Sequence, residues 1–175
     1  VDFGDMDGDG DLDLVTCTID SNFLSSGTTD TVEWHENNNG SWIIHPIDNN
    51  VLSTRGVDVA DMDGDGDLDI LSASFGDNTI SWYKNDGLAN PSFTAEDIDN
   101  QVITAHDIHA ADLDRDGDMD IIAASESYGE MNWWANNGDV NPQWSRRSLS
   151  TIVSHNWGEG VWGAQDIVPT DLDGD

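Results

Sequence analysis

The sequence has very few basic residues. Five Lys and Arg stand against 36 Asp and Glu, for a formal net charge of −31. Proteins that bind nucleic acid need clusters of Lys and Arg to neutralise phosphates, and binding to an anionic membrane surface has the same requirement. The composition therefore excludes both partners. A chain this acidic also repels itself unless cations neutralise it, and divalent cations are the natural partners of clustered carboxylates.

Cysteine and long apolar segments are scarce as well. The single cysteine, Cys17, excludes a disulfide within the chain, and we expect a small buried residue there, not a nucleophile. No apolar run approaches the roughly 20 residues that insert across a bilayer as a helix. However, 37% hydrophobic residues and eight Trp distinguish the chain from an acidic disordered segment.

An acidic motif of nine residues recurs along the chain. DMDGDGDLD occupies residues 5–13 and again 61–69, DLDRDGDMD occupies 112–120, and DLDGD begins at residue 171. The spacings are 61 − 5 = 56, 112 − 61 = 51 and 171 − 112 = 59 residues. Repeats of this length are typical of propellers and other repeat architectures.

The same short apolar segments surround each acidic motif. LDLVTCT, LDILSAS and MDIIAAS follow it, and their length and composition predict buried strands. A block with Trp34, Trp82 or Trp133 comes next and ends in an Asn/Gly turn, and a third segment carries Trp42, Phe93 or Trp144. A fourth segment (VDFGD, VDVAD, IHAAD or IVPTD) leads into each acidic loop.

Four short strands per repeat, without helical periodicity, predict an all-β fold of β-propeller blades. Each blade would have four antiparallel strands, with the acidic loop between the first and second strand. We expect the recurring Trp34, Trp82 and Trp133 to pack between blades. The repeats divide the chain into blade 1 at 1–53, with a partial first strand, blade 2 at 54–103, blade 3 at 104–153, and the start of blade 4 at 154–175.

A closed propeller needs roughly four or more blades, so we expect the chain to be part of a longer propeller or repeat array. Two insertions, at 19–31 and 154–163, interrupt the pattern. The second contains Trp157 and Trp162, which do not recur. Exposed aromatic rings there could contact a glycan by stacking on sugars, and packing within the loop is the alternative.

The acidic loops have the composition of calcium sites. Calcium takes about six to eight oxygen ligands in flexible geometry, and Asp at loop positions 1, 3, 5 and 9, with the carbonyl of position 7, can supply them. Magnesium keeps more of its water, and zinc prefers His or Cys. An EF-hand would need Glu at position 12, where Thr16, Ser72 and Ala123 stand instead. A solvated acidic turn that binds no ion is the remaining alternative.

We expect one calcium ion per complete loop, hence three, and a fourth if the last loop is completed. Glycine at position 6 (Gly10, Gly66 and Gly117) is expected to adopt a positive φ in a tight turn. The candidate ligands are Asp5, Asp7, Asp9, Asp11, Asp13, Asp61, Asp63, Asp65, Asp67, Asp69, Asp112, Asp114, Asp116, Asp118, Asp120, Asp171, Asp173 and Asp175.

The motif DxDGDGDxD, an apolar strand, WYxNDG and a further aromatic strand resemble the FG-GAP/VCBS repeat of integrin-α-like calcium-binding β-propellers. The resemblance implies Ca²⁺ between the first two strands of each blade. It also implies a non-catalytic module of a secreted or cell-surface protein, acting in adhesion, glycan binding or assembly. The expected partners are a glycan or protein at a surface, or copies of the chain itself. Arg115 departs from the pattern, because it replaces the Gly at position 4 of the third loop.

Two other functions fit the same residues. The repeats could stack into an extracellular filament as structural subunits, or form an accessory domain of a secreted polysaccharide lyase or hydrolase. No catalytic constellation is recognisable in the chain, and we expect no enzymatic activity from it. His106 and His109 lie three residues apart in a predicted strand and so face opposite sides, which favours polar strand-end residues over a shared metal role.

Overall fold

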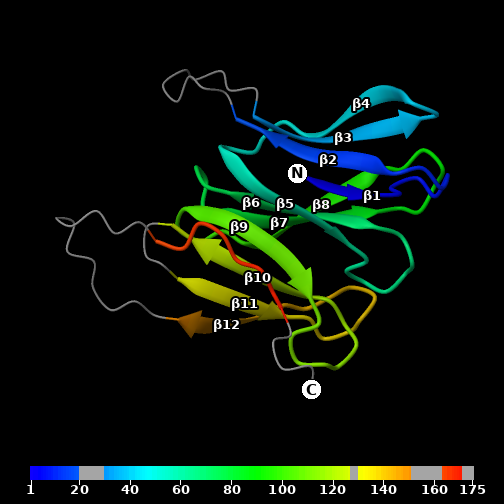
Figure 1. Cartoon of the computed structure of the whole chain (residues 1–175). Coiled ribbons are helices and arrows are strands. Elements are labelled where there is room, and N and C mark those ends of the chain that lie inside the picture. The colour runs from blue at the N-terminus through cyan, green and yellow to red at the C-terminus, as the bar shows by residue number, and fades with distance from the viewer. Residues whose placement is uncertain (20–29, 127–129, 151–162, 171–175) are drawn as a thin grey trace.

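The computed structural model describes residues 1–19, 30–126, 130–150 and 163–170, and Figure 1 shows them as three antiparallel sheets of four strands each. We call these sheets blades 1, 2 and 3 in chain order. No helix in the described ranges is long and apolar enough to cross a membrane. The strands are β1 (Asp2–Gly4), β2 (Asp13–Thr18), β3 (Thr31–Asn38) and β4 (Ser41–Asp48) in blade 1; β5 (Thr54–Ala60), β6 (Asp69–Ser74), β7 (Thr79–Asn85) and β8 (Phe93–Asp99) in blade 2; β9 (Ala105–Ala111), β10 (Asp120–Ser125), β11 (Met131–Ala135) and β12 (Ser145–Ser150) in blade 3.

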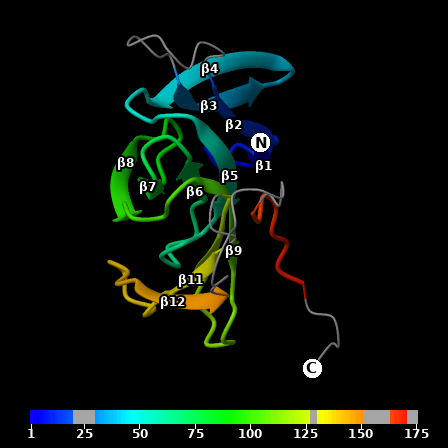
Figure 2. The ribbon, with the colours of Figure 1, turned by 90° about the vertical axis from the view of Figure 1, so that its left-hand side faces the viewer.

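Each blade is a meander in which consecutive strands pair, as the sequence predicts. In blades 2 and 3 the second strand is the most buried, since every residue of β6 and β10 is buried. Successive residues of a strand point to opposite faces of the sheet, so such a strand needs apolar contacts on both sides. In β6, Ile70 packs toward blade 1 and Leu71 toward blade 3. The blades therefore stack face to face, one after another down the view in Figure 2.

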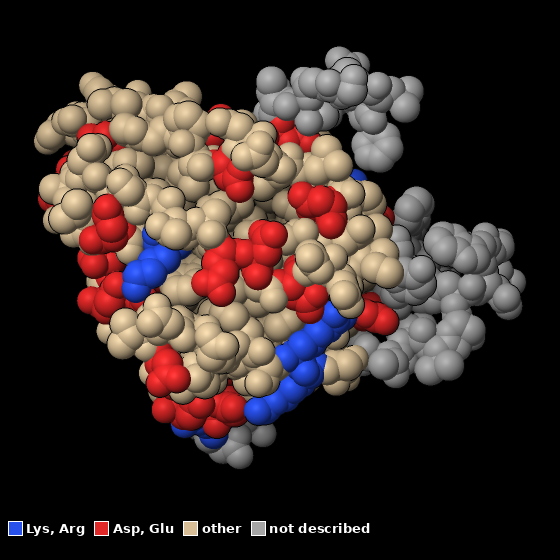
Figure 3. Space-filling model, turned by 180° about the vertical axis from the view of Figure 1, so that it is seen from behind, with Lys and Arg blue, Asp and Glu red and all other residues tan. Residues whose placement is uncertain are grey.

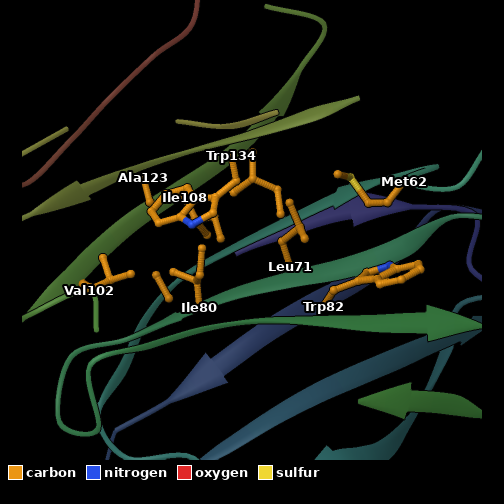
Figure 4. Close-up of a cluster of buried hydrophobic side chains, with 11 residues drawn as sticks. Met62, Leu71, Ile80, Trp82, Val102, Ile108, Ala123 and Trp134 are labelled. Atoms are coloured by element: carbon orange, nitrogen blue, oxygen red, sulfur yellow. The ribbon is translucent and has the colours of Figure 1, made fainter. Parts of the chain in front are cut away.

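Tryptophans fill the junctions between the blades. Trp34 lies in the cluster between blades 1 and 2 and is 2% exposed, and Trp82 lies in the cluster between blades 2 and 3 and is 3% exposed. Figure 4 shows Trp82 beside Leu71 and Met62 in that second cluster. The predicted packing of these two rings between blades is confirmed. Burial of a ring of this size contributes roughly 3–5 kcal/mol to stability, judged by what truncation to Ala costs in protein cores.

Trp133 occupies the same register position in blade 3, yet it is only half-buried, with the Arg147 guanidinium 4.4 Å from its ring centroid. Its neighbour Trp134 points the opposite way and fills the cluster between blades 2 and 3. Trp133 thus faces away from the preceding blade, as Trp82 does, and the described residues form no fourth sheet on that side, so its packing between blades stays a prediction.

The first strands of the blades meet along one side of the stack. β5 approaches β9 so closely that a Cβ on Gly56 would lie 3.0 Å from the Asp107 Cα. Carboxylates of one blade also accept main-chain hydrogen bonds from the next: Val59 N donates to Asp2 Oδ2 over 2.9 Å, and Ala110 N to Asp58 Oδ2 over 2.7 Å. Hydrogen bonds from main-chain N–H groups to carboxylates thus join successive blades, in addition to apolar packing.

The predicted strand before the fourth acidic loop is not formed. Residues 163–170 lie against β9, where Ile167 N donates to Asp107 Oδ2 over 3.0 Å, but they pair with no strand. In the repeat pattern their pairing partner is the strand after the fourth loop, and that loop (171–175, with Asp171, Asp173 and Asp175) lies outside the described residues. Trp157 and Trp162 also lie outside them, as do 20–29 of the first insertion and 154–162 of the second.

Candidate metal centres

Three acidic loops occupy the same place in the three blades, between the first and second strand. In each loop the carboxylates of positions 1, 3 and 9 converge, with one oxygen from each lying within 4.8 Å of the others. The sequence predicted these residues as ligands, and the structure brings them together in three groups: Asp5, Asp7 and Asp13; Asp61, Asp63 and Asp69; Asp112, Asp114 and Asp120.

The backbone of each loop turns back on itself because the residues at positions 4 and 6 adopt a left-handed conformation. Gly10, Gly66 and Gly117 at position 6 have φ of 94°, 96° and 100°, which confirms the predicted positive φ. In all three loops the N–H of this glycine donates to the carboxylate of position 1, as in the 3.0 Å bond from Gly10 N to Asp5 Oδ2. Local hydrogen bonds therefore hold the carboxylate of position 1 in place.

The position 9 aspartate is buried and bonded at both oxygens. In the second loop, Asp69 Oδ2 accepts from Met62 N over 3.1 Å, and Asp69 Oδ1 accepts from Asn85 N over 2.8 Å. Asp13 and Asp120 receive equivalent bonds. Burial nevertheless raises the pKa of the Asp69 carboxyl to about 6, because desolvation outweighs these two hydrogen bonds. Burial raises the pKa of Asp120 in the same way.

Two loop oxygens lack the hydrogen bonds that buried polar atoms normally make. Asp5 Oδ1 and Asp63 Oδ1 are buried without a partner, although a buried acceptor without one is rare in proteins. Burial, followed by the nearby carboxylates of Asp9, Asp13 and Asp5, also raises the pKa of Asp7. The donors are all oxygens, convergent and mutually repelling. This set fits calcium, and it lacks the nitrogen or sulfur ligands that zinc prefers.

Positions 5 and 7 are placed differently. Position 5 carboxylates accept the N–H two residues on, as in the 2.8 Å bond from Asp11 N to Asp9 Oδ1, and they are not members of the three groups. At position 7, the Asp67 carboxylate lies against Gly87, where a Cβ would come within 2.0 Å of Asp67 Oδ2. With its carboxylate placed there, position 7 would bind an ion through its main-chain carbonyl oxygen. The parts assigned to positions 5 and 7 stay predictions.

Each later blade is hydrogen-bonded to the loop of the blade before it. Asn85 Nδ2 donates to Met6 O of the first loop over 2.9 Å and to Leu68 O of its own loop over 3.0 Å. Asn136 repeats this arrangement with Met62 O and Met119 O. Asparagine at this turn was visible in the sequence, but its contact with the preceding loop was not, because it spans 79 and 74 residues of chain. A change in one loop therefore reaches the next blade.

A basic side chain adjoins the second loop. The Lys84 ammonium contacts the Asp63 carboxylate and lies 3.3 Å from Asp65 Oδ2. Sequence reasoning missed this residue. The signal was the excess of acidic residues, because with 36 Asp and Glu and only five Lys and Arg each basic side chain is expected to lie near a carboxylate. Figure 3 shows that the few basic side chains visible on that face lie next to acidic ones.

A fourth group combines Asp107 and His109 of β9 with Asp166. His109 Nδ1 lies 3.1 Å from Asp58 Oδ1, and His109 Nε2 lies 3.5 Å from Asp107 Oδ2. Hydrogen bonds with Asp107 and then Asp58 raise the pKa of His109 to about 10, so the imidazole is a cation at neutral pH. His106 Nε2 lies 3.1 Å from Arg55 Nη1 of β5. Both histidines therefore contact blade 2.

Cys17 is half-buried against the cluster between blades 1 and 2, and burial raises the pKa of its thiol. A raised pKa leaves less of the nucleophilic thiolate at neutral pH.

Comparison with known families agrees with the repeat geometry. A model of the FG-GAP-like repeat matches residues 5–72 and again 61–123, so that each match runs from one acidic loop through the next. The matched residues make up more than half of the chain. No curated protein shows a significant sequence match.

Proposed function

Since the chain belongs to the FG-GAP-like repeat family, we propose that it is a non-catalytic calcium-binding module of the β-propeller type, with one Ca²⁺ per complete acidic loop. One observation carries the proposal. In three blades the same three carboxylates converge, and in two of them a buried oxygen has no other partner. Asp at positions 1, 3 and 9 would hold the ion, with positions 5 and 7 completing its shell.

Calcium would supply charge neutralisation and loop closure. Three ions change the formal charge from −31 to −31 + 6 = −25. They also relieve the repulsion among carboxylates that the loop backbone already holds together. Because Asn85 and Asn136 connect each loop to the next blade, an ordered loop supports the junction as well as its own blade.

We place this module in a secreted or cell-surface protein that meets a glycan or a protein ligand. Extracellular calcium modules bind with dissociation constants of about 0.1–1 mM, a range that matches calcium outside cells. The acidic surface favours partners with positive charge or none, or partners bridged by the bound ions.

The test is thermal unfolding with a chelator, with calcium and with magnesium. An ion that binds only the folded chain stabilises it by about 2.7 kcal/mol when its concentration is 100 times its dissociation constant. Calcium should raise the melting temperature by several degrees above that in EDTA, and magnesium should raise it less. The variant Asp5→Asn/Asp7→Asn should lose one bound ion of three. An equal melting temperature in EDTA and in calcium would contradict the proposal.

A second candidate function, assembly into a filament, is favoured by the outer face of blade 1. On this face Phe3 is 60% exposed and Trp42 is 54% exposed. The residues at the same register positions of blade 2 are Val59 and Phe93, and both are packed against blade 1. At the other end of the stack Leu149 is 50% exposed, in the register of Ile47 and Ile98, which pack toward the next blade. Exposed apolar faces of this kind mark interaction surfaces, and two different faces allow head-to-tail contacts between copies.

Sedimentation velocity over a concentration series tests this second candidate. The unaltered chain should associate, and Phe3→Ser/Trp42→Ser should sediment as a monomer. Val140→Ser, which alters an equally exposed apolar residue in a loop of blade 3, is the control and should associate as before. A monomer at every concentration would rule the assembly out.

A further inference from the structure

The three acidic loops share one backbone but differ in the basic residues around them. Only five Lys and Arg occur in the chain, and three of them stand at the second and third loops: Lys84, Arg115 and Arg147. The ion pairs of the described residues include none between a Lys or Arg and a carboxylate of the first loop. Loops with the same ligands therefore sit in different electrostatic surroundings.

Lys84 belongs to β7 and lies two residues after Trp82. The corresponding positions after Trp34 and Trp133 are Glu36 and Ala135. The Lys84 ammonium contacts the Asp63 carboxylate, whose side chain has 0% exposure, and lies 3.3 Å from Asp65 Oδ2. The second loop thus has a tethered cation between its positions 3 and 5.

The first loop has the opposite charge at this position. Glu36 lies there, and its Oε2 is 2.8 Å from His45 Nε2. In the third loop Ala135 offers no charge, but Arg147 Nη1 approaches Asp114 Oδ2 at 3.8 Å. The Arg147 side chain is 52% exposed, so water screens its charge more than that of Lys84.

We infer that Lys84 is a built-in counter-cation that makes the loops unequal: the first loop binds calcium most tightly, and the second keeps its fold when calcium is absent. This inference rests on the proposed calcium function. A calcium ion at the second loop meets a fixed positive charge on the same carboxylates. Before or during binding, the ammonium must give up two contacts. The first loop has no such competitor, and its bare carboxylates gain most from an ion.

The test is a calcium titration of the full chain in competition with a chelator of known affinity. The unaltered chain should show one tight site, with the second loop weaker by about tenfold or more. Lys84→Met removes the charge at similar side-chain length, and it should raise the number of tight sites from one to two. The reciprocal Glu36→Lys should weaken the tight site by a similar factor and leave the second loop unchanged.

Arg55→Met is the matched control. It removes one positive charge as well, but Arg55 stacks on Phe75 and pairs with Glu126, away from the acidic loops. Its calcium affinities should stay within about twofold of those of the unaltered chain, because a distant surface charge is largely screened.

Thermal unfolding is the second measurement, because Lys84→Met should lower the melting temperature without calcium and increase the stabilisation that calcium gives. In EDTA, Lys84→Met should melt below the unaltered chain, because the second loop has lost the cation that pairs with Asp63 and Asp65. In saturating calcium it should gain more than the unaltered chain does. Three sites of equal affinity in the unaltered chain, or titrations that Lys84→Met does not change, would overturn the inference. Absence of saturable calcium binding in both proteins would instead overturn the proposed function.

Discussion

Arg115 occupies a left-handed backbone position, with φ of 62°, that Gly8 and Gly64 fill in the other two loops at 73° and 71°. This conformation costs an L-residue about 1 kcal/mol, whereas glycine adopts it freely. Arg115→Gly should therefore raise the free energy of unfolding by about 0.5–1 kcal/mol, measured by urea denaturation in EDTA.

Gly64→Ala is the reverse control, because it introduces a Cβ at the equivalent left-handed position of the second loop. Nothing lies within 4 Å of the added Cβ, so the backbone alone should lower stability, by about 1 kcal/mol. If Arg115→Gly proves destabilising while Gly64→Ala behaves as expected, the contacts of the arginine side chain outweigh its strain.

A second prediction at the residue scale concerns pH. Hydrogen bonds with Asp107 and Asp58 raise the pKa of His109 from its ordinary 6.5 to about 10. The folded state binds the proton more tightly, so its stabilisation is complete below pH 6.5 and is lost as the pH rises through about 10. Because the side chain is 31% exposed, we expect a loss of about 1–2 kcal/mol, far less than the full shift would give.

Urea denaturation between pH 6 and pH 10, at constant calcium, measures this loss. His109→Gln keeps a polar side chain and removes the titration, so its stability should fall less over the same interval. Equal losses in the two proteins would show that other groups cause the pH dependence.

At the scale of elements, the hairpin between the third and fourth strands ties each later blade to the preceding loop. The Asn136 side-chain amide donates to carbonyls of two blades, Met62 O and Met119 O, whereas among the described residues the Asn37 side-chain amide donates to Leu12 O of its own loop. A hydrogen bond contributes roughly 1 kcal/mol, and a buried carbonyl left without its donor costs about 1–3 kcal/mol.

Asn136→Ala should accordingly lower the free energy of unfolding by about 2–3 kcal/mol, and Asn37→Ala by about 1 kcal/mol. Chemical denaturation of the two variants gives the difference, which measures the bond between blades. Equal costs would mean that this bond adds nothing to the junction between blades 2 and 3.

At the scale of the whole molecule, the formal charge of −31 opposes compaction. Raising NaCl from about 0.05 M to about 0.5 M shortens the screening length from roughly 14 Å to roughly 4 Å. The melting temperature in EDTA should therefore rise with salt. In calcium the rise should be smaller, because bound ions have already neutralised the loops. A larger rise in calcium than in EDTA would show that the loops are not the main source of repulsion.

The sequence by itself determined the parts of this protein that depend on neighbouring residues. The three loops fold alike because the N–H of position 6 donates to the aspartate of position 1, and the aspartate of position 9 accepts the N–H of position 2. Each blade is a meander of consecutive strands. The recurrence of loop, apolar strand and tryptophan block was enough to predict four strands per blade. It also predicted the three carboxylates that converge in each loop, at positions 1, 3 and 9, while the part assigned to position 5 stays a prediction.

Only the tertiary structure determined which side chains contact each other between blades and around each loop. The sequence aligns Trp134 with Tyr83, but only the packing showed that Trp134 fills the cluster between blades 2 and 3, as Tyr83 fills the cluster between blades 1 and 2. Nor could the sequence show that Lys84 contacts Asp63, or that His109 lies between Asp58 and Asp107. These contacts join residues that the repeat pattern treats as unrelated, and burial and charge depend on the neighbours that packing brings together.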